Sequence, residues 1–114
     1  MKIAFTTKGT TWDSLMDPRF GRTEYLLVYD DIEDNIYTFD NRAIANEAHG
    51  AGPQTAKELF ELNPDVLITG NGLGGNAAAV VKKANIKIYI GAGEMSVKKA
   101  YNSYKANSLE EQEL

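Results

Sequence analysis

Residues 65–77 read DVLITGNGLGGNA, and this stretch decides the fold class of the chain. It starts with a continuous apolar run, Val66 to Ile68, which is typical of a strand buried on both faces of a sheet. A glycine-containing turn follows, and small apolar residues then recur with helical spacing. They are Ala77, Val80, Val81 and Ala84. A strand, a tight turn and a helix in this order predict an α/β protein.

The residues on either side extend this pattern. Upstream, Pro53 can occupy the first turn of a helix, and Pro64 ends that helix. Downstream, residues 86–90 are predicted to form a strand, after which Ser96 can cap a last helix. The apolar face of that helix consists of Val97, Ala100, Tyr101 and Tyr104. Residues 107–114 are polar, and we expect them to fray.

The N-terminal half of the chain contributes three more predicted strands, at residues 2–7, 24–30 and 36–39. Turn residues at 31–35 indicate that the second and third strands form an antiparallel hairpin. With two crossover units after Pro53, we expect a five-stranded mixed sheet of order 3-2-1-4-5 with helices on both faces. Only the second strand should be antiparallel. We expect one domain over residues 1–107 and an acidic tail over residues 108–114.

The composition narrows the classes of function. Hydrophobic residues make up 43% of the 114 residues, which is enough for a core, and no apolar run reaches the roughly 18 residues of a membrane span. Twelve basic and sixteen acidic residues give a net charge of −4, which speaks against broad binding to nucleic acid. The chain has no cysteine and starts with a strand pattern rather than a signal peptide. We therefore expect a cytoplasmic protein without thiolate ligands.

A first candidate site is the loop after the first strand. The guanidinium groups of Arg19 and Arg22 can form fork-like hydrogen bonds to an anion, and Gly21 would let the backbone approach closely. The alternative is a surface turn whose arginines pair with nearby carboxylates, since surface ion pairs are often incidental. The carboxylates in question are Asp13, Asp17 and Glu24.

A second candidate is the loop His49-Gly50-Ala51-Gly52, which precedes the helix at Pro53. A helix N-terminus offers free N–H groups and partial positive charge to an anion. His49 is the only imidazole in the chain, and it can ligate a metal or hydrogen-bond a ligand. The alternative is a loop histidine in a glycine turn, because a structural metal site wants about four ligands.

A third candidate is the glycine loop at residues 70–75, which matches G-x-G-x-x-G between a strand and a helix. Glu94 follows roughly 20 residues later, as in the dinucleotide-binding fingerprint. However, we find only one βαβ unit and no lysine-bearing phosphate loop. We therefore predict that the glycines serve a tight turn and helix–sheet packing, without tight NAD or ATP binding. Anion binding at this helix start stays open.

Taken in order, these segments resemble the dinitrogenase iron–molybdenum cofactor biosynthesis family over roughly residues 1–107. The matching pieces are Arg19-Phe20-Gly21-Arg22, His49-Gly50-Ala51-Gly52, Asp65 to Gly70, Gly74-Gly75-Asn76-Ala77, and Ile86 to Tyr89 before a last helix. The resemblance implies a ribonuclease H-like three-layer fold. It also implies a non-catalytic carrier or accessory protein for iron–sulfur or iron–molybdenum clusters. Many members have a histidine where Arg19 stands, and relatives carry a cysteine where Thr23 stands, so His49 is the remaining candidate metal ligand.

The loops and the resemblance together predict a cluster-binding protein that works with metal-cluster assembly proteins, as a monomer or weak dimer. The predicted cofactor-binding residues are Arg19, Phe20, Gly21, Arg22, His49, Gly50, Gly52, Gly74 and Asn76, with His49 as the metal ligand. Two alternatives stay open. One is a regulatory or interaction domain without a bound cluster, and the other is a nucleotide- or anion-binding domain that uses residues 70–75.

Overall fold

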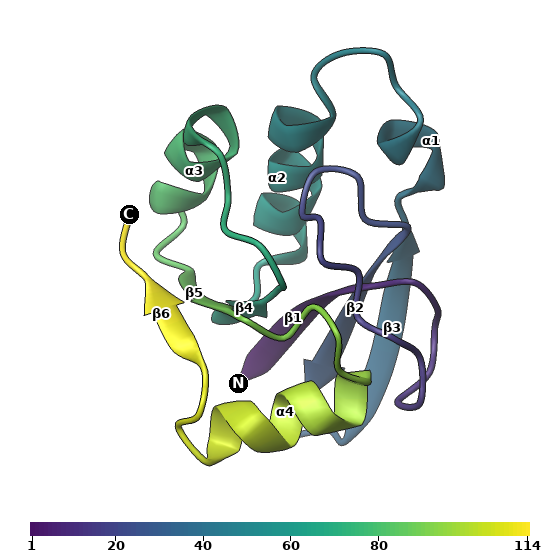
Figure 1. Cartoon of the computed structure of the whole chain (residues 1–114), viewed down its shortest axis with the longest axis vertical. Coiled ribbons are helices and arrows are strands. Elements are labelled where there is room, and N and C mark those ends of the chain that lie inside the picture. Colours follow the sequence, from purple (N-terminus) through teal and green to yellow (C-terminus); the bar gives the residue numbers. More distant parts are fainter.

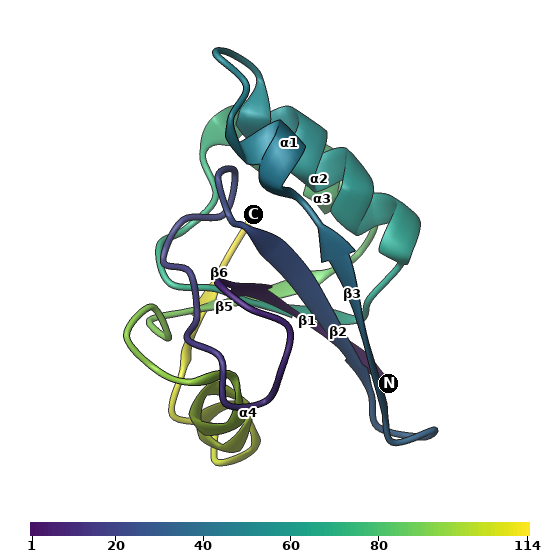
Figure 2. The same ribbon diagram turned by 90° about the vertical axis from the view of Figure 1, so that its right-hand side faces the viewer.

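The computed structural model describes residues 1–114 and shows a mixed sheet between two layers of helices (Figures 1 and 2). The strands are β1 (Lys2–Thr7), β2 (Tyr25–Asp30), β3 (Asn35–Asp40), β4 (Val66–Ile68), β5 (Lys87–Ile90) and β6 (Glu110–Gln112). The helices are α1 (Arg42–Ala45), α2 (Ala51–Leu62), α3 (Gly75–Lys82) and α4 (Val97–Lys105). No helix combines the length and the apolar character needed to cross a bilayer.

The sheet has six strands in the order β3-β2-β1-β4-β5-β6. β1 pairs antiparallel with β2 and parallel with β4, and β4 pairs parallel with β5. The mixed sheet and the relative order of the five predicted strands are therefore confirmed. The adjacency of β1 and β4 matters most for function, because it brings the loop after β1 close to the elements that flank β4.

The prediction of five strands is wrong, because the tail forms β6 instead of fraying. β6 pairs antiparallel with β5, so β2 is not the only antiparallel strand. Pairing at a sheet edge uses main-chain N–H and C=O groups, which a polar segment supplies as well as an apolar one. Leu109, just before β6, also packs against the core under α4. Side-chain polarity alone therefore gave the wrong expectation for residues 107–114.

The segment between the predicted third strand and Pro53 also contains structure that the sequence pattern did not reveal. The short helix α1 lies within it, and α2 starts at Ala51 rather than at Pro53. Pro53 still lies in the first turn of α2, where its missing N–H costs no helical hydrogen bond.

Two apolar layers hold the sheet to its helices. Ala4 of β1 faces the core under α2 and α3, whereas Ile3 and Phe5 face the core under α4, as alternation along a strand requires. Figure 2 shows α1, α2 and α3 on one face of the sheet and α4 on the other. The three-layer α/β arrangement is thus present, while the ribonuclease H-like label stays a prediction.

The start of α1 makes a testable prediction about pH. The Arg42 guanidinium donates hydrogen bonds from Nε and Nη2 to Asp40, at 2.9 and 2.7 Å, and these lower the pKa of Asp40 to about 2. The stabilising pair is fully present above the ordinary value of 3.8 and is lost as the pH falls through about 2. We expect carboxyl NMR to place the Asp40 midpoint near 2 in the native chain. Arg42→Ala should return it toward 3.8, and an unchanged midpoint would contradict the pairing.

Candidate functional site

A cleft lies where the loop after β1 meets the amino-terminal ends of α2 and α3. These two helices lie side by side and start on the same side of the molecule (Figures 1 and 2). The cleft has a volume of about 520 Å³, and an adjoining hollow of about 280 Å³ shares Gly21, Gly52, Pro53 and Asn76 with it. The structure therefore brings together three segments that are far apart in the sequence.

The lining of this cleft contains positively charged side chains and no negatively charged ones. The charged side chains that line it are those of Arg19 and Arg22, and His49 is the remaining titratable group. No carboxylate lines either the cleft or the adjoining hollow, although the chain as a whole carries a net charge of −4. A concave surface with guanidinium groups and no carboxylates favours an anionic ligand.

Both helix starts offer unused donors to this cleft. Neither α2 nor α3 has a side-chain cap, and their first intrahelical bonds run from Gln54 N–H to Gly50 and from Ala78 N–H to Gly74. The N–H groups of Ala51 and Gly52 in α2, and of Gly75, Asn76 and Ala77 in α3, have no hydrogen-bond partner in the chain. Such groups, together with the helix dipole, form a site for anions.

Asp17 braces Arg19 at the mouth of the cleft. The Asp17 side chain is fully buried, and its carboxylate accepts from Nε, Nη2 and the backbone N–H of Arg19, each at 3.1 Å. This bidentate contact raises the pKa of Arg19 and fixes the plane of its guanidinium group. The pairing with Asp17 that the sequence left as an alternative is thus present. Nη1 of Arg19 makes no hydrogen bond within the chain and stays available to a ligand.

Arg22 is held differently, because no carboxylate neutralises it. Its Nη1 donates to the carbonyl oxygens of Ala45 and Glu47, at 2.7 and 3.0 Å. These bonds orient the side chain along the loop that leads to His49, while Nε and Nη2 remain without partners. Arg22 therefore contributes the unpaired positive charge of the cleft.

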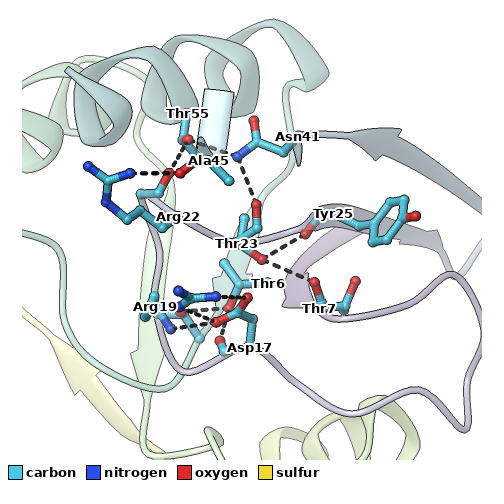
Figure 3. Close-up of polar contacts among 12 residues, drawn as sticks. Thr6, Thr7, Asp17, Arg19, Arg22, Thr23, Tyr25, Asn41, Ala45 and Thr55 are labelled. Carbon is cyan, nitrogen blue, oxygen red and sulfur yellow. Dashed lines mark hydrogen bonds and ion pairs between the residues drawn. The ribbon is translucent and has the colours of Figure 1, made fainter. Parts of the chain in front are cut away.

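A polar network that includes Thr55 and Asn41 holds Gly21, which lies between these arginines in the sequence. Figure 3 shows Thr55 and Asn41 together with both arginines. The Thr55 hydroxyl, on α2, donates to the Gly21 carbonyl at 2.8 Å and accepts from Asn41 Nδ2 at 3.0 Å. An added Cβ at Gly21 would lie 2.8 Å from the Gly52 Cα, so only glycine allows this approach. Thr23, the other position flagged by the resemblance, is buried with its hydroxyl close to backbone carbonyl oxygens and does not line the cleft.

The predicted site residues separate into two groups. The cleft is lined by seven of them, namely Arg19, Gly21, Arg22, His49, Gly50, Gly52 and Asn76. Phe20 and Gly74 line the adjoining hollow instead, and the Phe20 side chain is mostly buried in the core. Sequence reasoning missed Ala48, Ala51 and Pro53 as lining residues of the cleft, and Gly72, Gly75 and Ala77 as lining residues of the hollow. It named Asp17 only as an alternative partner of the arginines, not as a brace that orients Arg19 within the site. The acidic residue two positions before Arg19 was a signal for that brace, since such spacing permits a side-chain contact back to the turn.

The glycine loop at residues 70–75 serves packing at its first two glycines. An added Cβ on Gly70 would lie 2.6 Å from the Pro18 Cα, and one on Gly72 would lie 3.0 Å from Gln112 Oε1. Around Gly74 and Gly75, by contrast, no atom lies within 4 Å of an added Cβ. Glu94 lies in a different hollow, with Gly91 and Gly93. This arrangement favours the packing interpretation over a dinucleotide site.

The metal ligands and hydrogen-bond donors that the cleft offers determine which kind of metal-containing group can fit there. No group of three or more histidine, cysteine, aspartate or glutamate side chains is placed to hold a metal ion. No carboxylate, thiolate or second imidazole lines the cleft beside His49, so the cleft does not offer the ligand set of a bare metal ion. A metal group that carries its own inorganic ligands and a net negative charge does fit, because the free donors here are N–H groups.

Fold and cleft together define a small α/β protein with a cleft lined by arginines at the starts of two uncapped helices. The sequence profile described as Dinitrogenase iron-molybdenum cofactor matches residues 1–107, and the chain belongs to this family. No protein of curated function matches it significantly.

Solved structures agree with this assignment. The apo form of the orange protein from Desulfovibrio gigas is 31% identical, with a TM-score of 0.90 over 97% of this chain and 92% of that one. A Thermotoga protein described as NifB-like and as a member of the DUF35 family is also 31% identical, with a TM-score of 0.81 over 96% of this chain and 91% of that one. The structure of PH0822, at 16% identity and a TM-score of 0.73 over 98% and 96%, supports the fold alone. The family and the two structures at 31% identity indicate a cofactor-associated or accessory protein.

Proposed function

We propose that this chain is a non-catalytic carrier or accessory protein that binds an anionic iron–sulfur or iron–molybdenum cluster in the cleft. One observation carries the proposal: two arginines and two uncapped helix starts share a cleft that no carboxylate lines. The family to which the chain belongs is named for such a cofactor. Metal-cluster assembly proteins would be the partners that load or unload it.

Each part of the cleft has a separate role in this proposal. Arg22 supplies unpaired charge, and Arg19 supplies a guanidinium group whose plane Asp17 has already fixed. The N–H groups at the starts of α2 and α3 donate to the sulfide or other terminal atoms of the cluster. His49, which is exposed at the edge of the cleft, adds a hydrogen bond. When bound, the cluster itself supplies the metal and redox chemistry.

Salt dependence tests this mode of binding. A cluster held by charge and hydrogen bonds should bind more weakly as salt screens the arginines, since the Debye length shrinks from about 10 Å at 0.1 M to about 3 Å at 1 M salt. We expect the affinity for a soluble thiolate-capped iron–sulfur cluster to fall about tenfold over that range. Anaerobic titration followed by visible absorbance measures it.

Two outcomes would contradict the proposal. If the native chain binds neither that cluster nor isolated iron–molybdenum cofactor, the interaction-domain alternative becomes the better one. If binding occurs but does not depend on salt, covalent ligation holds the cluster instead of charge.

A further inference from the structure

The polar tail contacts the glycine loop, which lines the adjoining hollow, through the side chain of Gln112. Gln112, the last residue of β6, accepts a hydrogen bond from Leu73 N–H at Oε1 (2.9 Å) and donates from Nε2 to the Leu73 carbonyl (3.2 Å). The side-chain amide thus provides a hydrogen-bond partner for both the N–H and the C=O of Leu73, as the backbone of a neighbouring strand would. These two bonds join positions 39 residues apart in the sequence.

Leu73 occupies a position that controls the start of α3. Its side chain is only 7% exposed and belongs to the core under α2 and α3. The next residue, Gly74, is the N-cap of α3. Because glycine has no side chain, Gly74 cannot form the side-chain capping bond that would otherwise hold the start of the helix. Fixing the Leu73 peptide groups therefore fixes the direction in which the free N–H groups of Gly75 and Asn76 point.

The absence of a side chain at Gly72 leaves space for the Gln112 amide. An added Cβ on Gly72 would lie 3.0 to 3.1 Å from all three terminal atoms of the Gln112 side chain, so glycine at this position leaves room for the amide. The other attachments of the tail are the three-residue pairing of β6 with β5 and the packing of Leu109, and the two glutamates of β6 are exposed. The tail is therefore attached weakly enough to detach while the core remains folded.

We propose that the C-terminal strand is a detachable latch in which Gln112 positions the glycine loop and thereby sets the affinity of the cleft. This regulation rests on the proposed cluster-binding function. With the latch closed, the N–H groups of α3 are held in place before the ligand arrives. With the latch open, the loop must be ordered at the moment of binding, which weakens affinity. By linkage, a bound cluster should also hold β6 more tightly.

Amide exchange tests the latch without any ligand. In Gln112→Ala, the Leu73 N–H loses its acceptor, and we expect its exchange, measured by NMR, to become about tenfold faster. Gly72→Ala should have the same effect by displacing the Gln112 side chain. Glu111→Ala is the matched control, because this exposed side chain on the same strand makes no hydrogen bond in the chain. An unchanged Leu73 exchange rate in both Gln112→Ala and Gly72→Ala would overturn the latch, whatever the cluster does.

Cluster titration then tests the coupling. We expect Gln112→Ala to bind the thiolate-capped iron–sulfur cluster about fivefold more weakly than the native chain, and Glu111→Ala to bind it equally well. Faster exchange with unchanged cluster affinity would overturn the coupling to the cleft but leave the proposed function intact. If the native chain binds no cluster, the proposed function fails, and the exchange of Leu73 and of the first amides of α3 still decides whether Gln112 positions the loop.

Discussion

Replacing Gly70 by alanine is expected to destabilise the chain by about 3 kcal/mol, because the added methyl group meets backbone on two sides. An ideal Cβ at this position would lie 2.6 Å from the Pro18 Cα and 2.8 Å from the Gly93 Cα. Backbone atoms cannot rotate out of the way as a flexible side chain can. The Pro18 carbonyl also accepts from Asn71 N–H at 2.7 Å, so any shift strains a short hydrogen bond.

Gly75→Ala is the matched control for this prediction. No atom lies within 4 Å of an added Cβ there, and the residue is in the first turn of α3, where alanine is preferred to glycine by up to about 1 kcal/mol. Urea unfolding of both variants measures the difference. If the free energy of unfolding of Gly70→Ala lies within about 0.5 kcal/mol of the native value, the backbone at Gly70, Pro18 and Gly93 is not packed as tightly as described.

The second large effect concerns cluster binding. Replacing both Arg19 and Arg22 by glutamine should weaken binding of the thiolate-capped cluster on the order of 100-fold, since hydrogen bonds to charged groups contribute about 1.5–3 kcal/mol each. Replacing His49 by alanine should weaken it only about fivefold, because this removes a single hydrogen bond. Anaerobic titration of the purified variants compares the two losses.

The design of this comparison needs two controls. Arg19→Gln leaves the Asp17 carboxylate buried without its charged partner, so Arg22→Gln alone is the cleaner test of charge. Arg42→Gln removes a positive charge outside the cleft and should leave affinity unchanged. A His49→Ala variant that loses all binding, beside a double arginine variant that keeps it, would show that ligation rather than charge holds the cluster.

The parts of the fold that follow from side-chain pattern were predictable. The apolar run at residues 66–68 and the alternation of Ile3, Ala4 and Phe5 reflect burial, so the sequence places those strands correctly. β6 and α1 depend on other forces. β6 forms by main-chain pairing at an open edge, and the Asp40 contact with Arg42 starts a helix with no buried residue. Hydrophobic pattern carries no information about either.

The position of the candidate site was also predictable from the sequence, whereas the contacts that hold it were not. Because β1 and β4 were expected to be neighbours, Arg19, Arg22 and His49 could be expected at one end of the sheet, and the structure places all three around one cleft. The long-range contacts that hold the cleft were not predictable. The bonds from Thr55 to Gly21 and from Gln112 to Leu73 join a side chain to a distant main-chain group, which any polar residue at the right point in space could make.

Anomalous X-ray scattering from crystals loaded with cluster would locate the metal atoms relative to these residues. We expect metal density in the cleft between Arg22 and the first turns of α2 and α3, with every protein contact made through N–H donors. No metal atom should lie within the roughly 2 Å of a direct metal–nitrogen bond to His49. Metal density outside the cleft, or a direct bond to the His49 imidazole, would contradict binding by charge and hydrogen bonds.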